Sequence, residues 1–262
     1  MNGAWQNGNS YERFMGRWSH LIAREFLRWL AVPPNSKWLD VGCGTGSLTK
    51  QILETNRPQS IVSVDASPEF VAFARQMVPD TAVQFRVGLA QSLELEANQF
   101  DAAVSGLVLN FVPQPEAAIA EMLRVTKPGG TVGIFLWDYA EGMEMLRYFW
   151  NAAVALDKNA EALDEGVRFP LCQRDELESL VDKCGLKQIV GIPIEVVTHF
   201  QGFVDYWAPF LGHVGPAPAY VMSLTPKQRQ KLEDRVHAAL PIREDGSISL
   251  VARAWAVKGI TE

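Results

Sequence analysis

The sequence predicts an α/β fold, in which helices cover both faces of a doubly wound, mostly parallel sheet. The first reason is that short apolar runs at residues 38–41 and 61–64 have the length of buried strands. The second is that apolar residues at helical spacing follow each run, beginning at Leu48 and at Phe70. The third is that alternating glycines join the first run to its helix through a tight turn, as in a βα unit.

The glycine turn is a candidate ligand site. Gly42, Gly44 and Gly46 leave the backbone bare, and the free N–H groups of a helix start attract anionic groups. The dinucleotide pattern G-x-G-x-x-G is absent because Ser47 stands at its third glycine, and the phosphate-binding G-x-x-x-x-G-K-[ST] is absent too. Asp65 ends the next strand, where an acid can accept hydrogen bonds from both hydroxyls of a ribose. Together these features indicate a nucleoside ligand.

Four motifs in order resemble those of class I S-adenosylmethionine-dependent methyltransferases of the small-molecule type. They lie at residues 39–46, at Asp65, at residues 100–106 and at the Lys-Pro-Gly-Gly turn 127–130. The chain resembles the ubiquinone/menaquinone-biosynthesis methyltransferase group in particular. The resemblance implies a seven-stranded Rossmann-like sheet with an antiparallel strand at or near its edge. It also implies S-adenosylmethionine as the cofactor.

The resemblance implies where the cofactor binds. The glycine turn would face its methionine part and Asp65 its ribose, while Tyr11 and Arg17 would touch the methionine end. The Arg17 guanidinium would suit the methionine carboxylate as a fork-shaped donor. The expected cofactor-binding residues are Asp40, Gly42, Cys43, Gly44, Gly46, Asp65, Ala66, Leu89, Ala90, Ser105, Gly106, Leu107, Tyr11 and Arg17.

One position departs from the family pattern. Leu89 follows Gly88, where the family commonly has an acid that bonds the adenine amino group. The main chain of Leu89 and Ala90 can still bond the adenine edge, and the Gln91 side chain can help. Loss of one neutral hydrogen bond would lower the affinity by about 0.5–1.5 kcal/mol.

The chain of 262 residues is long enough for one large α/β domain with insertions or for two small ones. We expect a single methyltransferase domain, in which a helical segment precedes the core and two helical insertions form a lid. Thr225 and Gln228 in the second insertion have capping-box spacing. The expected boundaries are about 11–32 for the helical segment, 33–139, 175–198 and 248–262 for the core, and 140–174 and 199–247 for the lid.

The chemistry expected is methyl transfer from the sulfonium to an acceptor by in-line displacement. A strong nucleophile needs only placement, whereas a phenol or hydroxyl needs a general base. The candidate bases are His199, His213 and Asp138, and no pattern selects among them. The candidate acceptor-binding residues are Asn110, Trp137, Tyr139, Tyr206 and Trp207, each explained at least as well by local packing. The aromatic residues in both insertions favour a small apolar or aromatic acceptor.

Composition narrows the remaining classes. The net charge of −6 argues against a general nucleic-acid surface. Cys43, Cys172 and Cys184 lack metal-ligand spacing, so we expect no metal and reduced thiols in a cytoplasmic protein. No apolar stretch has the length of about 18 residues that a membrane helix needs. We expect a monomer or homodimer that acts on a small molecule.

Two other functions stay open. An NAD(P)-dependent oxidoreductase is disfavoured by the G-x-G-x-G spacing and by the Lys-Pro-Gly-Gly turn. A non-catalytic sensor or partner protein that binds S-adenosylmethionine is compatible with every motif. The glycine turn and Asp65 would bind the cofactor in either case, but they perform no chemistry.

Overall fold

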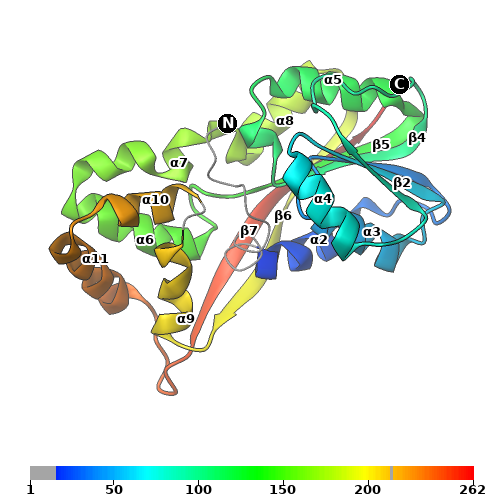
Figure 1. The fold of residues 1–262 in the computed structure, drawn as a ribbon. Helices are drawn as coiled ribbons and strands as arrows, with labels where there is room; N and C mark the ends of the chain where they lie inside the picture. The colour runs from blue at the N-terminus through cyan, green and yellow to red at the C-terminus, as the bar shows by residue number, and fades with distance from the viewer. Residues whose placement is uncertain (1–15, 213–214) are drawn as a thin grey trace.

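The structure, a computed structural model, describes residues 16–212 and 215–262 and contains a seven-stranded sheet in the order β3-β2-β1-β4-β5-β7-β6 (Figure 1). Neighbouring strands from β3 to β5 are parallel, and β7 is antiparallel to both β5 and β6. The predicted doubly wound sheet is therefore confirmed. The reversed strand β7 lies one place in from the edge strand β6. The strands are β1 (Lys37–Val41), β2 (Ser60–Asp65), β3 (Val83–Val87), β4 (Phe100–Gly106), β5 (Thr126–Trp137), β6 (Lys187–Phe200) and β7 (Ile248–Ile260).

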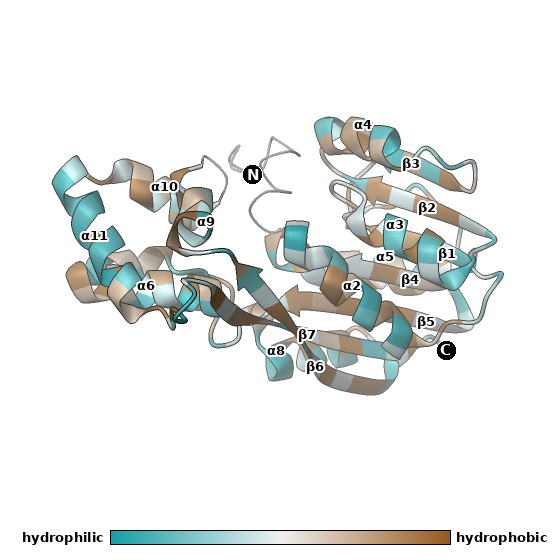
Figure 2. Ribbon diagram, turned by 90° about the horizontal axis from the view of Figure 1, so that it is seen from below, coloured by the Kyte–Doolittle hydropathy of each residue, from teal (hydrophilic) through white to brown (hydrophobic). Residues whose placement is uncertain are grey.

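Helices cover both faces of the sheet, as Figures 1 and 2 show from two directions. One face carries α2 (Arg17–Leu30), α3 (Ser47–Asn56) and α4 (Pro68–Met77), and the other carries α5 (Pro115–Val125) and α8 (Arg174–Lys183). From β1 the chain adds β2 and β3 on one side, and from β4 it adds β5 on the other side. Because crossovers between parallel strands are right-handed, connections that run in opposite directions place their helices on opposite faces of the sheet. A switch point thus lies between β1 and β4, where doubly wound folds bind ligands.

The Lys-Pro-Gly-Gly segment is the one irregular part of β5. The pairing with β4 passes directly from Phe100–Thr126 to Ala102–Thr131, so residues 127–130 lie opposite Asp101 alone. Gly129 there has a φ of 76°, which a residue with a side chain rarely adopts. The expected turn is therefore a bulge within the assigned strand.

The two insertions form one helical body beside the sheet (Figure 2). The Tyr206 hydroxyl donates to the Met145 carbonyl over 2.7 Å, and the Phe149 and Phe210 rings stack with centroids 4.6 Å apart. The capping box of Thr225 and Gln228 is present at the start of α11. The helices of this body are α6 (Glu144–Leu156), α7 (Glu165–Arg168), α9 (Phe203–Trp207), α10 (Pro216–Ser223) and α11 (Pro226–Ala239).

The helical body is joined to the sheet by the long strands β6 and β7. The pairing of β5 with β7 ends at Ala254, while β6 and β7 pair onward to Phe200 and Ile248. The first six residues of β7 therefore have β6 as their only strand neighbour among the described residues, and they lead towards the insertions (Figure 1). In the described part of the chain, no helix combines the length and the apolarity that crossing a membrane requires.

We predict that Glu165 makes stability fall as the pH rises. The side chain is 4% exposed, and burial raises its pKa to about 7, although its carboxylate accepts a hydrogen bond from the Trp150 indole. The folded state therefore holds a proton that the unfolded chain, with the ordinary value of 4.5, has released. The stability that Glu165 contributes should be fully present below pH 4.5 and should be lost as the pH rises through 7.

Urea denaturation of the wild type and of Glu165→Gln between pH 4.5 and pH 8 tests this prediction. The variant should show a flatter pH dependence across that window. Some slope should remain, because burial also raises the pKa of Asp40 to about 7. Parallel profiles for the two proteins would contradict the prediction.

Candidate active site

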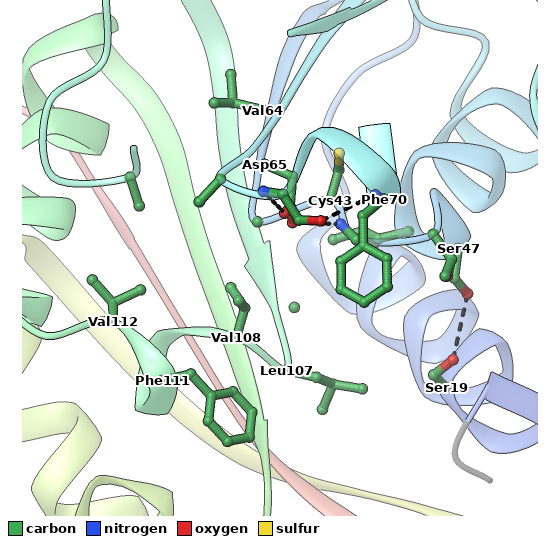
Figure 3. A pocket seen from close by; sticks show the side chains of 18 of the residues that line it. Ser19, Cys43, Ser47, Val64, Asp65, Phe70, Leu107, Val108, Phe111 and Val112 are labelled. Carbon is green, nitrogen blue, oxygen red and sulfur yellow. Dashed lines mark hydrogen bonds between the residues drawn. The ribbon is translucent and has the colours of Figure 1, made fainter. Parts of the chain in front are cut away.

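A cavity of about 470 Å³ opens at the carboxyl ends of the central strands. Figure 3 shows Asp65, Cys43 and Phe70 gathered in its middle, with Phe111 and Val112 across from Ser19 and Ser47. The lining comes from the glycine turn, the start of α4, the segment after β3, the segment after β4 and the end of β5. The cavity thus lies at the switch point between β1 and β4 and contains the glycine turn and Asp65, where the sequence predicts a ligand.

The glycine turn is held by backbone contacts that side chains would prevent. Gly42, Gly44 and Gly46 have φ values of 77°, 51° and 88°. A Cβ at Gly42 would lie 2.3 Å from a methyl group of Val108, so the segment after β4 packs directly on the turn. A Cβ at Gly44 would meet nothing within 4 Å, and Gly44 lines the cavity. Bare backbone is thus presented to a ligand at Gly44.

Asp65 joins two turns. Its carboxylate accepts hydrogen bonds from the Gly44 N–H at 2.8 Å and the Ser67 N–H at 2.9 Å. The side chain is 8% exposed, and burial raises the pKa of this carboxyl while the two N–H donors lower it. Each carboxylate oxygen has two lone pairs, so acceptor capacity remains for a ligand that donates.

Asp40 and Gly46 do not line the cavity, which differs from the expected contacts with the cofactor. Asp40 is fully buried beneath the turn, where one carboxylate oxygen accepts from the Thr49 hydroxyl at 2.6 Å. Its other oxygen has no hydrogen-bond partner among the described residues. Gly46 lies against α4, since a Cβ there would be 3.2 Å from the Ala74 side chain. Both residues support the turn from below.

Arg17 points to the second insertion instead of the cavity. Its guanidinium binds both oxygens of Asp205, at 2.8 and 3.2 Å, and lies over the Phe200 ring. Helix α2 lines the cavity with Ser19 and Ala23. In this structure Arg17 thus lies outside the lining, and its guanidinium pairs with an acid 188 residues away in the chain. Tyr11 lies outside the described residues.

The hydroxyls of Ser19 and Ser47 lie 3.5 Å apart at the same side of the cavity (Figure 3). Ser47 begins α3, and the Ser19 hydroxyl donates to the Gly16 carbonyl at 3.0 Å. Sequence reasoning missed this pair. The helical pattern of α2 reports which residues are apolar, but it does not indicate that Ser19 meets the start of α3.

The segment after β4 leaves the sheet sharply. Leu107 has a φ of 62°, which costs a residue with a side chain roughly 1–2 kcal/mol, and its N–H donates to the Phe135 carbonyl at 2.8 Å. Gly106 sits against the Phe135 ring, where a Cβ would be 2.6 Å away. Ser105 is buried in β4 and lies outside the lining. The expected cofactor residues that do line the cavity are Gly42, Cys43, Gly44, Asp65, Ala66, Leu89, Ala90, Gly106 and Leu107.

The part of the cavity after β4 and β5 is apolar. Phe111 and Val112 line it together with Trp137 and Tyr139, two of the expected acceptor residues. Phe111 is the last residue of η2 (Leu109–Phe111) and Val112 comes directly after it, and no sequence pattern had singled them out. Asn110 lies in the same short helix but outside the lining.

The remaining expected acceptor residues lie elsewhere. Tyr206 and Trp207 are buried in the helical body, where the Trp207 ring stacks on Phe203 with centroids 6.0 Å apart. Aromatic residues are common both in ligand pockets and in hydrophobic cores, so the sequence alone could not separate the two. In this structure both side chains are part of the core of the helical body. Among the described residues, no three His, Cys, Asp or Glu side chains gather as a metal site would need.

Neither described candidate base faces the cavity. Asp138 is 2% exposed, and its carboxylate pairs with the Arg253 guanidinium at 2.7 Å. His199 lies on β6 with its ring 3.3 Å from the Ser249 hydroxyl. Both side chains thus contact residues of β7 and do not face the cavity. His213 lies outside the described residues.

The sequence of this chain is similar to those of known methyltransferases. Residues 39–134 match the family model described as "Methyltransferase domain". An uncharacterized methyltransferase of Mycobacterium tuberculosis is 35% identical over 161 residues, which cover 62% of this chain and 61% of that protein. The 2-methyl-6-phytyl-1,4-hydroquinone methyltransferase of Synechocystis is 30% identical over 47% of this chain and 39% of its own length. Demethylmenaquinone methyltransferase of Renibacterium salmoninarum is 33% identical over 44% of this chain and 45% of its own.

Solved structures share the fold at low identity. A putative methyltransferase from an antibiotic biosynthesis pathway of Anabaena variabilis superimposes with a TM-score of 0.63 at 19% identity, covering 90% of this chain and 96% of that one. Phosphoethanolamine N-methyltransferase 2 of Haemonchus contortus, with S-adenosylhomocysteine bound, gives 0.60 at 17%, covering 97% and 57%.

These findings define the class of protein. Residues 39–134 lie in a class I, S-adenosylmethionine-dependent methyltransferase domain, and S-adenosylmethionine is the cofactor of that domain. The chain spans 39 to 61% of the length of the curated relatives described above.

We predict different effects for the substitutions Gly42→Ala and Gly44→Ala. Gly42→Ala places a methyl group into Val108 and should lower the free energy of unfolding by about 1–3 kcal/mol. Gly44→Ala meets open space, so it should cost less stability but should weaken binding of S-adenosylhomocysteine. Urea denaturation and calorimetric titration of both variants separate these effects. Equal loss of stability in the two variants would contradict the packing described for the turn.

Proposed function

We propose that this protein transfers the methyl group of S-adenosylmethionine to a small, apolar or aromatic acceptor by in-line displacement. One observation carries the proposal: a single cavity combines the Asp65 carboxylate and the bare glycine turn on one side with an apolar part after β4 and β5 on the other. The proposal extends to a cytoplasmic protein that acts as a monomer or homodimer.

In the proposed complex the cofactor lies across the ends of β1, β2 and β3, with its methionine, ribose and adenine at successive strands. Its ribose hydroxyls donate to Asp65 at the end of β2, and its methionine lies against Gly44 and the start of α3. The amino-acid end carries two charges, so the hydroxyls of Ser19 and Ser47 and the helix start suit it. The adenine then lies beyond β2, beside Leu89 and Ala90 after β3.

The apolar part of the cavity would hold the acceptor. Its described lining from Val108 to Pro113 and at the end of β5 brings no charged side chain, whereas Asp65 and Glu69 lie on the nucleoside side. A charged acceptor would therefore lose its hydration without gaining a partner, which is costly. The rings of Trp137 and Tyr139 would suit both a flat acceptor and the positive sulfonium.

Chemistry in such a site would rest mainly on placement. Of the described residues, Tyr139 brings the one titratable side chain to the apolar part. An acceptor that is already a good nucleophile needs orientation and exclusion of water more than a base. Two relatives are named for acting on a hydroquinone and on a demethylmenaquinone, and we propose a ring acceptor of comparable chemistry for this chain.

We predict that Asp65→Ala weakens binding of S-adenosylhomocysteine by about 10- to 100-fold, since a hydrogen bond to a charged group is worth roughly 1.5–3 kcal/mol. Calorimetric titration of the wild type and the variant measures the change. Asp80→Ala is the matched control, because Asp80 also accepts a backbone N–H but is exposed and lies outside the cavity.

The outcomes separate the candidate functions. A wild type that binds neither S-adenosylmethionine nor S-adenosylhomocysteine would refute the proposal. Tight binding of both, without methyl transfer to any of a panel of phenols, quinols, thiols and amines, would favour a non-catalytic binder.

Adenine recognition would rest on Gln91. Leu89 is 52% exposed at the cavity and offers no side-chain hydrogen bond. Gln91 also lines the cavity, and its amide makes no hydrogen bond within the described part of the chain. A carboxamide can donate and accept at once, which is how Gln pairs with the adenine edge in duplex DNA.

We predict that Gln91→Leu weakens S-adenosylhomocysteine binding by roughly 2- to 13-fold, the range for one neutral hydrogen bond of about 0.5–1.5 kcal/mol. The variant should also discriminate less against S-inosylhomocysteine, which lacks the adenine amino group. Gln84→Leu, on the exposed side of β3, is the control. Discrimination that is unchanged in Gln91→Leu would show that the main chain alone reads the base.

A further inference from the structure

An aromatic side chain of the first insertion contacts two walls of the cavity. The Phe169 ring lies edge-on to Phe111, with centroids 5.1 Å apart and planes at 78°. It also contacts Tyr139, with centroids 6.0 Å apart. Phe111 and Tyr139 line the cavity, and Phe169 is outside the lining. Phe169 therefore packs against both wall residues without lining the cavity itself.

The segment that carries Phe169 is held firmly to the helical body. Asp164 accepts the Gly166 N–H at 2.8 Å and pairs with the Arg147 guanidinium at 2.9 Å. The Glu165 carboxylate accepts from the buried Trp150 indole. Charged partners with low exposure fix α7 in place, so Phe169 one residue later has little freedom to move as a loop would.

The same segment is seated on the chain that follows the cavity wall. A Cβ at Gly166 would lie 2.9 Å from the Tyr139 carbonyl oxygen and 2.9 Å from the Ala140 Cα. The absence of a side chain therefore lets α7 approach this backbone closely. Phe169 and Tyr139 are thus fixed relative to each other by the ring contact and by the backbone approach.

These contacts have a consequence for the size of the acceptor space. Closely packed rings cannot recede without opening a void, and voids in packed interiors are costly. Phe111 lies in the segment after β4 and Tyr139 in the segment after β5, and Phe169 limits how far either ring can withdraw. A residue that never touches the ligand can therefore determine the volume available to it.

We propose that Phe169 is a specificity-determining residue, which limits the size of the aromatic acceptor by holding the Phe111 and Tyr139 rings in place. This inference rests on the proposed function, because it assigns the apolar part of the cavity to the acceptor. Phe169 acts through the two wall residues and is a positioning residue, not a catalytic one.

The test compares two aromatic probes of different size, phenol and 2-naphthol, on the full-length protein saturated with S-adenosylhomocysteine. Dissociation constants are measured for the wild type, Phe169→Ala, Phe169→Leu and Phe169→Tyr. The matched control is Phe203→Ala, which trims a partly buried Phe that contacts Tyr206, Trp207 and His237 away from the cavity. Binding of S-adenosylhomocysteine to every variant is titrated first.

We expect the preference for 2-naphthol over phenol to rise about fourfold or more in Phe169→Ala, the factor for burial of roughly one further CH₂-sized group. Phe169→Leu should show a smaller rise, while Phe169→Tyr and Phe203→Ala should match the wild type. Affinity for S-adenosylhomocysteine should stay within about twofold in all of them, since the cofactor part of the cavity is unchanged. If Phe169→Ala does not fold, the ratio in Phe169→Leu decides.

The inference would be overturned by an unchanged ratio in the Phe169 variants or by an equal rise in Phe203→Ala. It would also be overturned if neither probe bound to the wild type or to any of the Phe169 variants. Failure of S-adenosylhomocysteine to bind the wild type would instead remove the proposed function. The first titration shows that failure before any probe is added, so the two results cannot be confused.

Discussion

The hydrogen bonds of the Asp65 carboxylate to the Gly44 and Ser67 N–H groups are the contact on which the site depends. They tie the turn after β1 to the turn after β2, which come from separate βα units. The same carboxylate faces the cavity with acceptor capacity to spare. Beneath it, Asp40 and Thr49 hold the glycine turn from the buried side. The site is therefore pre-organised by the fold before any ligand arrives, which lowers the entropy cost of binding.

Polarity divides the cavity in a way that suits methyl transfer. The described carboxylates of the lining, Asp65 and Glu69, lie at the end of β2 and the start of α4, while the segment after β4 and the end of β5 are apolar. The sulfonium loses its positive charge as the methyl group leaves. An apolar environment, with a low effective dielectric constant, strengthens the attraction between that charge and an electron-rich acceptor. Aromatic walls supply such an environment without adding a fixed charge that would compete.

The insertions act on the site indirectly. They contribute no described residue to the lining itself, but Phe169 packs against Phe111 and Tyr139, and Asp205 binds Arg17 at the start of α2. The helical body thus contacts both the apolar wall and the helix that carries Ser19 to the cavity. Its own aromatic core, around Phe149 and Phe210, keeps these contacts in a constant position. The helical body therefore supports the cavity without lining it.

The sequence by itself determined the parts that depend on neighbours along the chain. The strand–glycine turn–helix unit, the strand ending in Asp65 and the capping box of α11 all follow from local spacing, and they stand where it predicted. Only the tertiary structure decided the placement of β7 beside the edge strand, the pairing of Arg17 with Asp205, and the burial of Tyr206 and Trp207 away from the cavity. It also decided that Ser19, Phe111 and Val112 face the ligand space. The physical reason is that a side chain's partner in a folded chain is chosen by packing between segments far apart in sequence, and periodicity describes only which face is buried, not what it meets.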